Sequence, residues 1–189
     1  MRSALVAATA TLLAAGPVRA DPPLVEGLAG ALRGCEEWVL NPRSWAEGTA
    51  PFVSAVGLAE TMGEVEAVDE ASLPPKPLRR ANHFWRINST LTAGYVLVVS
   101  DQLPMCHITG GGDVDLQPVA EEVLGAAAFS RRWEKLSDEI KGEMKTTFFR
   151  NREDPDFSLV VSRAATAGQR LDRVQVIATA IYQVGARRR

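Results

Sequence analysis

Three strand-like segments follow one another in the last third of the chain, and they constrain its fold more than any other feature. They span residues 140–149, 157–163 and 174–184, with short polar turns between them. In the last segment apolar side chains alternate along one face, from Val174 to Val184, which is typical of a half-buried strand. Consecutive strands separated by short turns predict an antiparallel meander.

The segments before this meander predict helices and further strands. Apolar positions recur every three or four residues from Leu24 to Val39, as they do along one side of an amphipathic helix. The elements expected after it are a helical piece at residues 43–57, strands at 83–90, 95–99 and 105–109, and a helix capped by Asp113 or Asp115 that runs to about Phe129 or further.

An acidic and then proline-rich stretch, residues 60–82, interrupts this order. So long a connection is uncommon in a compact domain, and we expect irregular chain packed along one side of the sheet. A short strand around residues 65–68 is the alternative for its first part. No internal repeat is evident in the sequence.

Together these elements predict an α+β fold: a two-layer domain with one antiparallel sheet of five or six strands and two or three helices packed mainly on one face. The order of elements resembles that of profilin-like and PAS-like two-layer domains. That resemblance implies a domain that binds, senses or scaffolds, although a fold alone does not determine a function.

The first 20 residues predict where the protein works. A positive start at Met1-Arg2, an apolar run of about a dozen residues and an A-x-A-like end at Ala20 are typical of a secretory signal peptide. We expect cleavage after Ala20 and a periplasmic or secreted protein. The mature chain is then a single domain over residues 21–185, followed by a basic tail at 186–189.

The two cysteines, Cys35 and Cys106, are 71 residues apart. In an oxidising compartment such a pair predicts a disulfide. The competing interpretation is a reactive thiol at Cys106, activated by His107. Adjacent residues on a strand point to opposite faces, however, so His107 is badly placed for that role. The disulfide is therefore the favoured interpretation.

Composition argues against several classes of function. The net charge of −2 falls to about −4 once Arg2 and Arg19 leave with the leader, so no nucleic-acid partner is expected. No other apolar stretch reaches the roughly 20 residues that a membrane span needs, so no anchor is expected in the mature chain. Two histidines without metal-ligand spacing predict no metal site and no cofactor.

The most distinctive short string runs from Cys106 to Asp113 and contains three consecutive glycines, Gly110 to Gly112. We expect these glycines to end a strand and turn into the next helix, where backbone can approach a ligand closely. The residues expected to contact a ligand or partner are Trp85, His107, Gly111 and Asp113.

No complete catalytic set is recognisable in the chain. A hydrolase could use His107 with a nearby carboxylate, Asp113 or Asp101, but no G-x-S-x-G motif identifies a nucleophile. The favoured hypothesis is an exported, non-enzymatic domain that binds a protein or small molecule in the cell envelope. The alternatives are that hydrolase and a structural envelope protein.

Overall fold

The computed structural model describes residues 20–46, 48–169 and 174–182. The described part contains four α-helices: α1 (Pro22–Leu40), α2 (Thr49–Val56), α3 (Gln117–Gly125) and α4 (Ala127–Arg132). It also contains three 3₁₀ helices: η1 (Pro42–Ser44), η2 (Glu70–Ser72) and η3 (Lys76–Leu78). The predicted leader, apart from Ala20, and the predicted basic tail lie outside these residues.

Eight strands form one antiparallel sheet in the described chain. They are β1 (Met62–Val65), β2 (Asn82–Ile87), β3 (Ala93–Ser100), β4 (Met105–Gly112), β5 (Trp133–Lys141), β6 (Met144–Asn151), β7 (Phe157–Ala164) and β8 (Val176–Tyr182). Their order across the sheet is β1-β2-β3-β4-β8-β7-β6-β5, so β4 and β8 meet at the centre.

The α+β class and the single antiparallel sheet are confirmed, whereas the expected numbers of five or six strands and two or three helices were too low. The chain runs through two helices and four strands, and then again through two helices and four strands. We call the part from α1 to β4 the first half and the part from α3 to β8 the second half.

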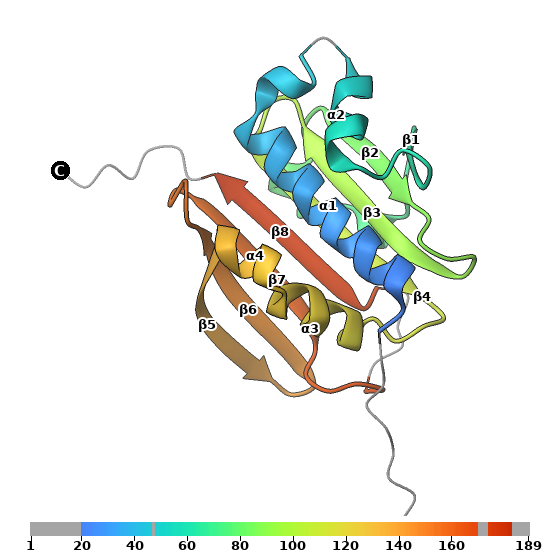
Figure 1. Ribbon diagram of the computed structural model, residues 1–189, viewed down its shortest axis with the longest axis vertical. Coiled ribbons are helices and arrows are strands. Elements are labelled where there is room, and N and C mark those ends of the chain that lie inside the picture. Colours follow the sequence, from blue (N-terminus) through green and yellow to red (C-terminus); the bar gives the residue numbers. More distant parts are fainter. Residues whose placement is uncertain (1–19, 47, 170–173, 183–189) are drawn as a thin grey trace, which may run out of the picture.

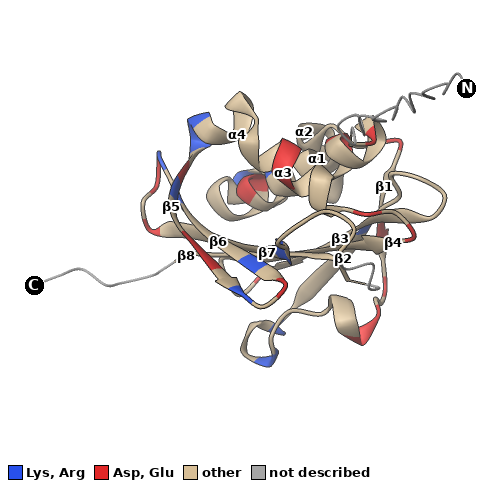
Figure 2. Cartoon of the chain, turned by 90° about the horizontal axis from the view of Figure 1, so that it is seen from below, with Lys and Arg blue, Asp and Glu red and all other residues tan. Residues whose placement is uncertain are grey.

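The four α-helices lie on one face of the sheet, as Figure 1 and Figure 2 show. The apolar stripe of α1, including Leu24, Leu28 and Leu32, is buried against β3 and β4. The close packing of α1 on β3 depends on glycine at position 34, because a Cβ there would lie only 3.1 Å from the Leu97 side chain. None of the described helices is long and apolar enough to span a membrane.

The disulfide predicted from the sequence joins this helix to the centre of the sheet. Cys35 on α1 and Cys106 on β4 are bonded, with their Cα atoms 5.4 Å apart, and both are buried in the core. The bond therefore joins the helical layer to a strand whose neighbours are β3 and β8.

Among the described residues, only the first half of the opposite face of the sheet is covered. The connection between β1 and β2, residues 66–81, lies against this face, and we call it the covering segment. The edge of the cover is visible in two register pairs between β4 and β8. Met105 is 0% exposed whereas its partner Ile181 is 40% exposed, and Thr109 is 2% exposed whereas Ile177 is 38% exposed. The irregular chain expected at residues 60–82 is thus present, with β1 at its start.

The sequence prediction was wrong at strand β5. We expected the helix to extend to about Phe129 or further and a strand over residues 140–149. Instead α3 and α4 are separate, and β5 begins at Trp133. Ile140 belongs to β5, and a turn with Gly142 at a φ of +58° leads into β6. This edge strand is difficult to recognise in the sequence because most of its side chains are exposed and polar. Only Trp133 of its nine residues is buried.

The expected glycine turn was also wrong, because Gly110 to Gly112 continue strand β4. Gly110 leaves space for the Tyr95 ring, which lies 2.6 Å from where a Cβ would stand. Gly112 has a φ of +135°, which favours glycine. Helix α3 begins only at Gln117, whose N–H donates to Asp115 Oδ1 at 3.0 Å, so Asp115 rather than Asp113 satisfies a free donor of the first turn.

Candidate functional site

The four residues predicted to contact a ligand do not meet in one place. Trp85 is buried on the helix-covered face, in register with Leu97. His107 is buried on the opposite face, and Asp113 is exposed after β4. Gly111 lines a pocket under the covering segment.

His107 is held as a neutral side chain inside the sheet. Its Nδ1 lies 2.8 Å from the Thr179 hydroxyl on the neighbouring strand β8. Burial, together with the positive charge of Arg79, lowers the pKa of His107 to about 4. Thr179 is its hydrogen-bond partner, and among the described residues no carboxylate hydrogen-bonds to it. This environment favours a structural histidine.

The histidine that does contact carboxylates is His83. Its Nδ1 lies 2.9 Å from Glu64 and its Nε2 lies 2.9 Å from Asp101, beside the Trp38 ring. Partial burial opposes the charge, but the hydrogen bonds to Asp101 and Glu64 prevail and raise the pKa of His83. His83 and His107 lie on opposite faces of β2 and β4, and the described residues contain no cluster suited to a metal ion.

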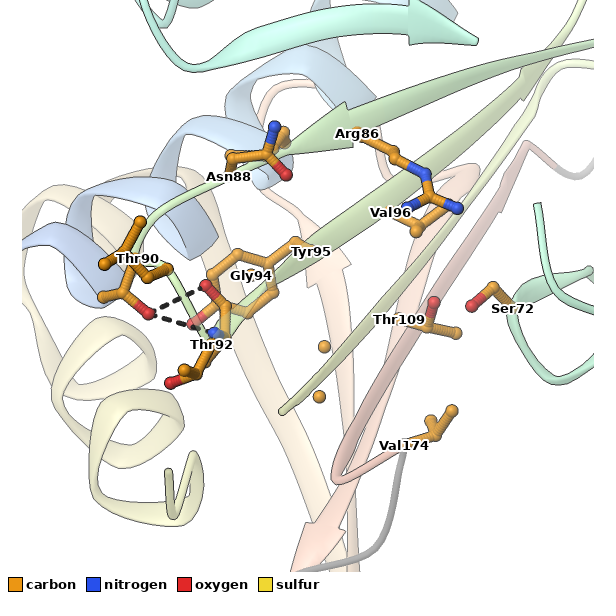
Figure 3. Close-up of a pocket in the computed structure, with 15 residues that line it drawn as sticks. Ser72, Arg86, Asn88, Thr90, Thr92, Gly94, Tyr95, Val96, Thr109 and Val174 are labelled. Carbon is orange, nitrogen blue, oxygen red and sulfur yellow. Dashed lines mark hydrogen bonds between the residues drawn. The ribbon is translucent and has the colours of Figure 1, made fainter. Parts of the chain in front are cut away.

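The pocket that contains Gly111 lies at one end of strands β2, β3 and β4, and we call it the polar pocket (Figure 3). Its volume is about 250 Å³. Its floor consists of two register rows on the face opposite the helices. One row is Arg86, Val96 and Thr109, and the next is the pair Gly94 and Gly111. Ser72 on η2 and Val174 before β8 form its sides.

The Thr109 hydroxyl is the most informative atom of the polar pocket. Thr109 is almost completely buried, yet its Oγ1 has no hydrogen-bond partner in the described chain. Figure 3 shows Ser72 reaching from the covering segment toward Thr109. A buried hydroxyl without a partner typically destabilises a protein by about 1–3 kcal/mol, so such a group needs an explanation. A bound molecule that hydrogen-bonds to Thr109 would supply one.

The remaining polar groups give the pocket its chemical character. Arg86 is exposed at one side of the floor, and no described residue forms a hydrogen bond or ion pair with it. Asn88, Thr90 and Thr92 add further polar groups along the chain that leads to β3 (Figure 3). The Thr90 hydroxyl already bonds to Ala93, at 3.1 Å to its carbonyl and 3.0 Å to its N–H. The pocket thus offers hydroxyl and amide groups and one unpaired cation.

The two glycines of the floor differ in what they do. A Cβ on Gly94 would lie 2.3 Å from the Ile87 carbonyl oxygen, so packing of the strands alone requires glycine there. Gly111 is its register partner on β4 and lines the pocket with its backbone.

Sequence reasoning found Gly111 but missed Thr109, Arg86 and Ser72. One available signal was the alternation in β2, which places Arg86 and Asn88 on the same side. No feature of the sequence identifies Ser72 as a pocket residue, because its position depends on how the covering segment folds back over the sheet.

Comparison of the chain with protein-family models, with curated proteins and with solved structures found no match. The chemistry of the polar pocket is therefore inferred from its own residues.

Proposed function

We propose that this protein is an exported, non-enzymatic binding protein whose polar pocket holds a small, hydroxyl-bearing organic anion of monosaccharide size. The observation that supports this most is the buried Thr109 hydroxyl, which has no partner in the described chain and lines the pocket. A ligand hydroxyl or carboxylate beside Thr109 would satisfy it.

The charge and shape of the pocket support an anion rather than a neutral or cationic ligand. Arg86 has no carboxylate partner among the described residues, and a guanidinium forms paired hydrogen bonds with a carboxylate. The hydroxyls of Ser72 and Thr92 suit a ligand with several hydroxyl groups. A volume of about 250 Å³ limits the ligand to a small molecule.

Export is supported by the disulfide between Cys35 and Cys106, which fits an extracellular or periplasmic protein. The hydrolase alternative draws no support from the contacts of His107, whose partner is Thr179. The alternative of a purely structural envelope protein predicts that the polar pocket binds nothing.

The test is a calorimetric and NMR titration of the purified mature protein with glucuronate, and with glucose as the neutral analogue. We expect glucuronate to bind, to shift the amide resonances of Gly94 and Gly111, and to bind at least about tenfold more tightly than glucose, as one charge-assisted contact allows. Arg86→Ala should remove this preference. Arg43→Ala, a change at an exposed arginine of η1, should not.

Absence of binding by both sugars, or equal binding that Arg86→Ala leaves unchanged, would overturn the proposal. Thr109→Val provides a second variant, because it keeps the shape of the side chain and removes only the hydroxyl. Glucuronate affinity should fall in this variant as well.

A further inference from the structure

A second cavity lies on the helix-covered side of the sheet, between helices α3 and α4 and strands β5, β6 and β7. In Figure 1 the two helices lie in front of this part of the sheet. The cavity has a volume of about 330 Å³, and we call it the cationic cavity. The side chains that give it its character are Glu121, Lys135, Lys145, Arg152, Arg163 and three aromatic residues, Phe129, Trp133 and Phe149.

A fully buried arginine stands at the base of this cavity. Arg163 on β7 is 2% exposed. Its Nε and Nη2 lie 2.9 and 2.8 Å from Glu121 Oε1, and its Nη1 donates to the Thr147 hydroxyl at 2.8 Å. Lys145 Nζ reaches the same Glu121 oxygen at 3.2 Å. One carboxylate on α3 is thus shared by two cations from the sheet.

The charges around the cavity do not balance. Four of the lining side chains are cations and one is an acid. Lys135 pairs with Asp138 at the edge of β5. Arg152 donates through Nε to the Ser130 carbonyl at 3.0 Å, and it forms no ion pair with any described residue. Even with Asp138 included, four cations stand beside two carboxylates, and Glu134 on β5 also feels the charge of Arg152. Positive charge therefore predominates among the side chains that line this partly enclosed space.

The opposite wall of the cavity is aromatic. The Phe129 ring lies 5.0 Å from the Phe149 ring and 6.1 Å from the Trp133 ring, measured between centroids. The Trp133 indole N–H donates to Glu36 at 2.6 Å, outside the cavity, so these three rings offer carbon surface rather than hydrogen bonds. Excess positive charge beside an aromatic wall suits a ligand that carries both a negative charge and a flat apolar body.

We propose that the cationic cavity binds an aromatic carboxylate, with the carboxylate directed to Arg152 and the ring held by Phe129, Trp133 and Phe149. This ligand differs in chemistry from the hydroxylated anion of the polar pocket, and the two sites lie on opposite faces of the sheet. The two proposals are therefore independent.

The test uses 1-naphthoate as the probe and 1-naphthalenemethanol as its neutral counterpart of similar shape, titrated into the mature protein by calorimetry. We expect 1-naphthoate to bind at least about tenfold more tightly than the alcohol. Arg152→Gln should weaken naphthoate binding about fivefold to tenfold and leave the affinity for the alcohol unchanged. Arg131→Gln is the matched control, because Arg131 is an exposed arginine of α4 that does not line this cavity.

Arg163 itself is unsuitable as a first variant, because its burial makes loss of folding a competing result. Glu121→Gln provides the second variant, since it removes the acid among the lining side chains and makes the cavity more positive. Naphthoate should bind several-fold more tightly to this variant, provided that circular dichroism shows a folded chain. A purely structural ion pair would give no such gain. Equal affinity for the two probes, or naphthoate binding that Arg152→Gln does not alter in a folded protein, would overturn the proposal.

Discussion

The two halves of the sheet are built from the same order of elements, yet they differ in what covers them. In the first half the connection between the first two strands is long, residues 66–81, and it buries the face opposite the helices. The equivalent connection in the second half, between β5 and β6, consists only of residues 142–143 and cannot reach across the sheet. Ile177 and Ile181 on β8 are exposed as a result.

This difference shows that one loop can decide whether half of a sheet has a core on one side or on two. Antiparallel sheets tolerate one solvated face, so the second half needs no cover to be stable. The first half has the disulfide and the double-sided burial, and the second half has the buried ion pair of Arg163. We therefore expect changes in the first half to have the larger effects on stability.

The largest effect should come from removing the disulfide. We expect the double variant C35A/C106A to lose roughly 4 kcal/mol of unfolding free energy, because the bond closes a 71-residue loop in the unfolded chain. Urea denaturation measures this loss, and adding a reductant to the parent protein should reproduce it. A loss below about 1 kcal/mol would mean that the stability of the first half does not depend on the disulfide.

The next effect tests the edge of the cover directly. Met105 and Ile181 are register partners on the same face, one covered and one open. We expect Met105→Ala to destabilise the protein by about 3 kcal/mol, because it leaves a cavity under the covering segment. Ile181→Ala should cost less than about 1 kcal/mol. Similar losses in the two variants would show that the covering segment contributes little.

Acidification should weaken the first half through His107. Its folded pKa of about 4 lies below the ordinary value of 6.5, so between these values the unfolded chain binds a proton that the folded chain does not. Unfolding free energy should therefore fall by about 2 kcal/mol from pH 6.5 to about pH 4.5 because of this group. In His107→Gln the fall measured by urea titration should be smaller by that amount; an unchanged slope would contradict the prediction.

His83 should act with the opposite sign. Its pKa is raised, so its contribution is fully present below the unfolded pKa of 6.5 and is lost as the pH rises through the folded pKa. The stability difference between the parent protein and His83→Gln should therefore be larger in acid than above neutral pH. A constant difference across this range would show that the contacts with Glu64 and Asp101 do not favour the charged ring.

The smallest effect should be a gain. Thr109→Val removes a buried hydroxyl that has no partner among the described residues, so the ligand-free protein should become more stable by about 1 kcal/mol. Thermal unfolding without ligand and with glucuronate separates stability from binding. A loss of stability in the ligand-free variant would mean that the hydroxyl is already satisfied.

Much of the fold could be predicted because its signals are periodic. The stripe on α1 and the alternation in β7 and β8 follow from burial on one side, and Cys35 lies on the buried stripe. Strand β5 could not be predicted, because an exposed edge strand such as Leu136 to Lys141 has little apolar alternation to show. The prediction that Gly110 to Gly112 form a turn was wrong, because glycine is needed there for close packing within the sheet and not for a turn.

The candidate sites were harder to predict because they depend on contacts between distant segments. Thr109 is unremarkable in the sequence, and its hydroxyl becomes informative only once the covering segment lies over β4. Arg163 and Glu121 are 42 residues apart and meet because α3 packs over β7. Neither the burial of Thr109 nor the pairing of Arg163 with Glu121 produces a recognisable pattern in the local sequence.

The place of β8 in the sheet has a consequence for how the chain reaches this fold. β8 comes after every other strand in the sequence, yet it lies between β4 and β7 at the centre of the sheet. A chain that emerges from its amino end can form the bond between Cys35 and Cys106 early, but the edge of β4 remains open until β8 arrives. Until β8 arrives, the first half would leave that edge of β4 unpaired, and insertion of β8 would be the step that joins the two halves.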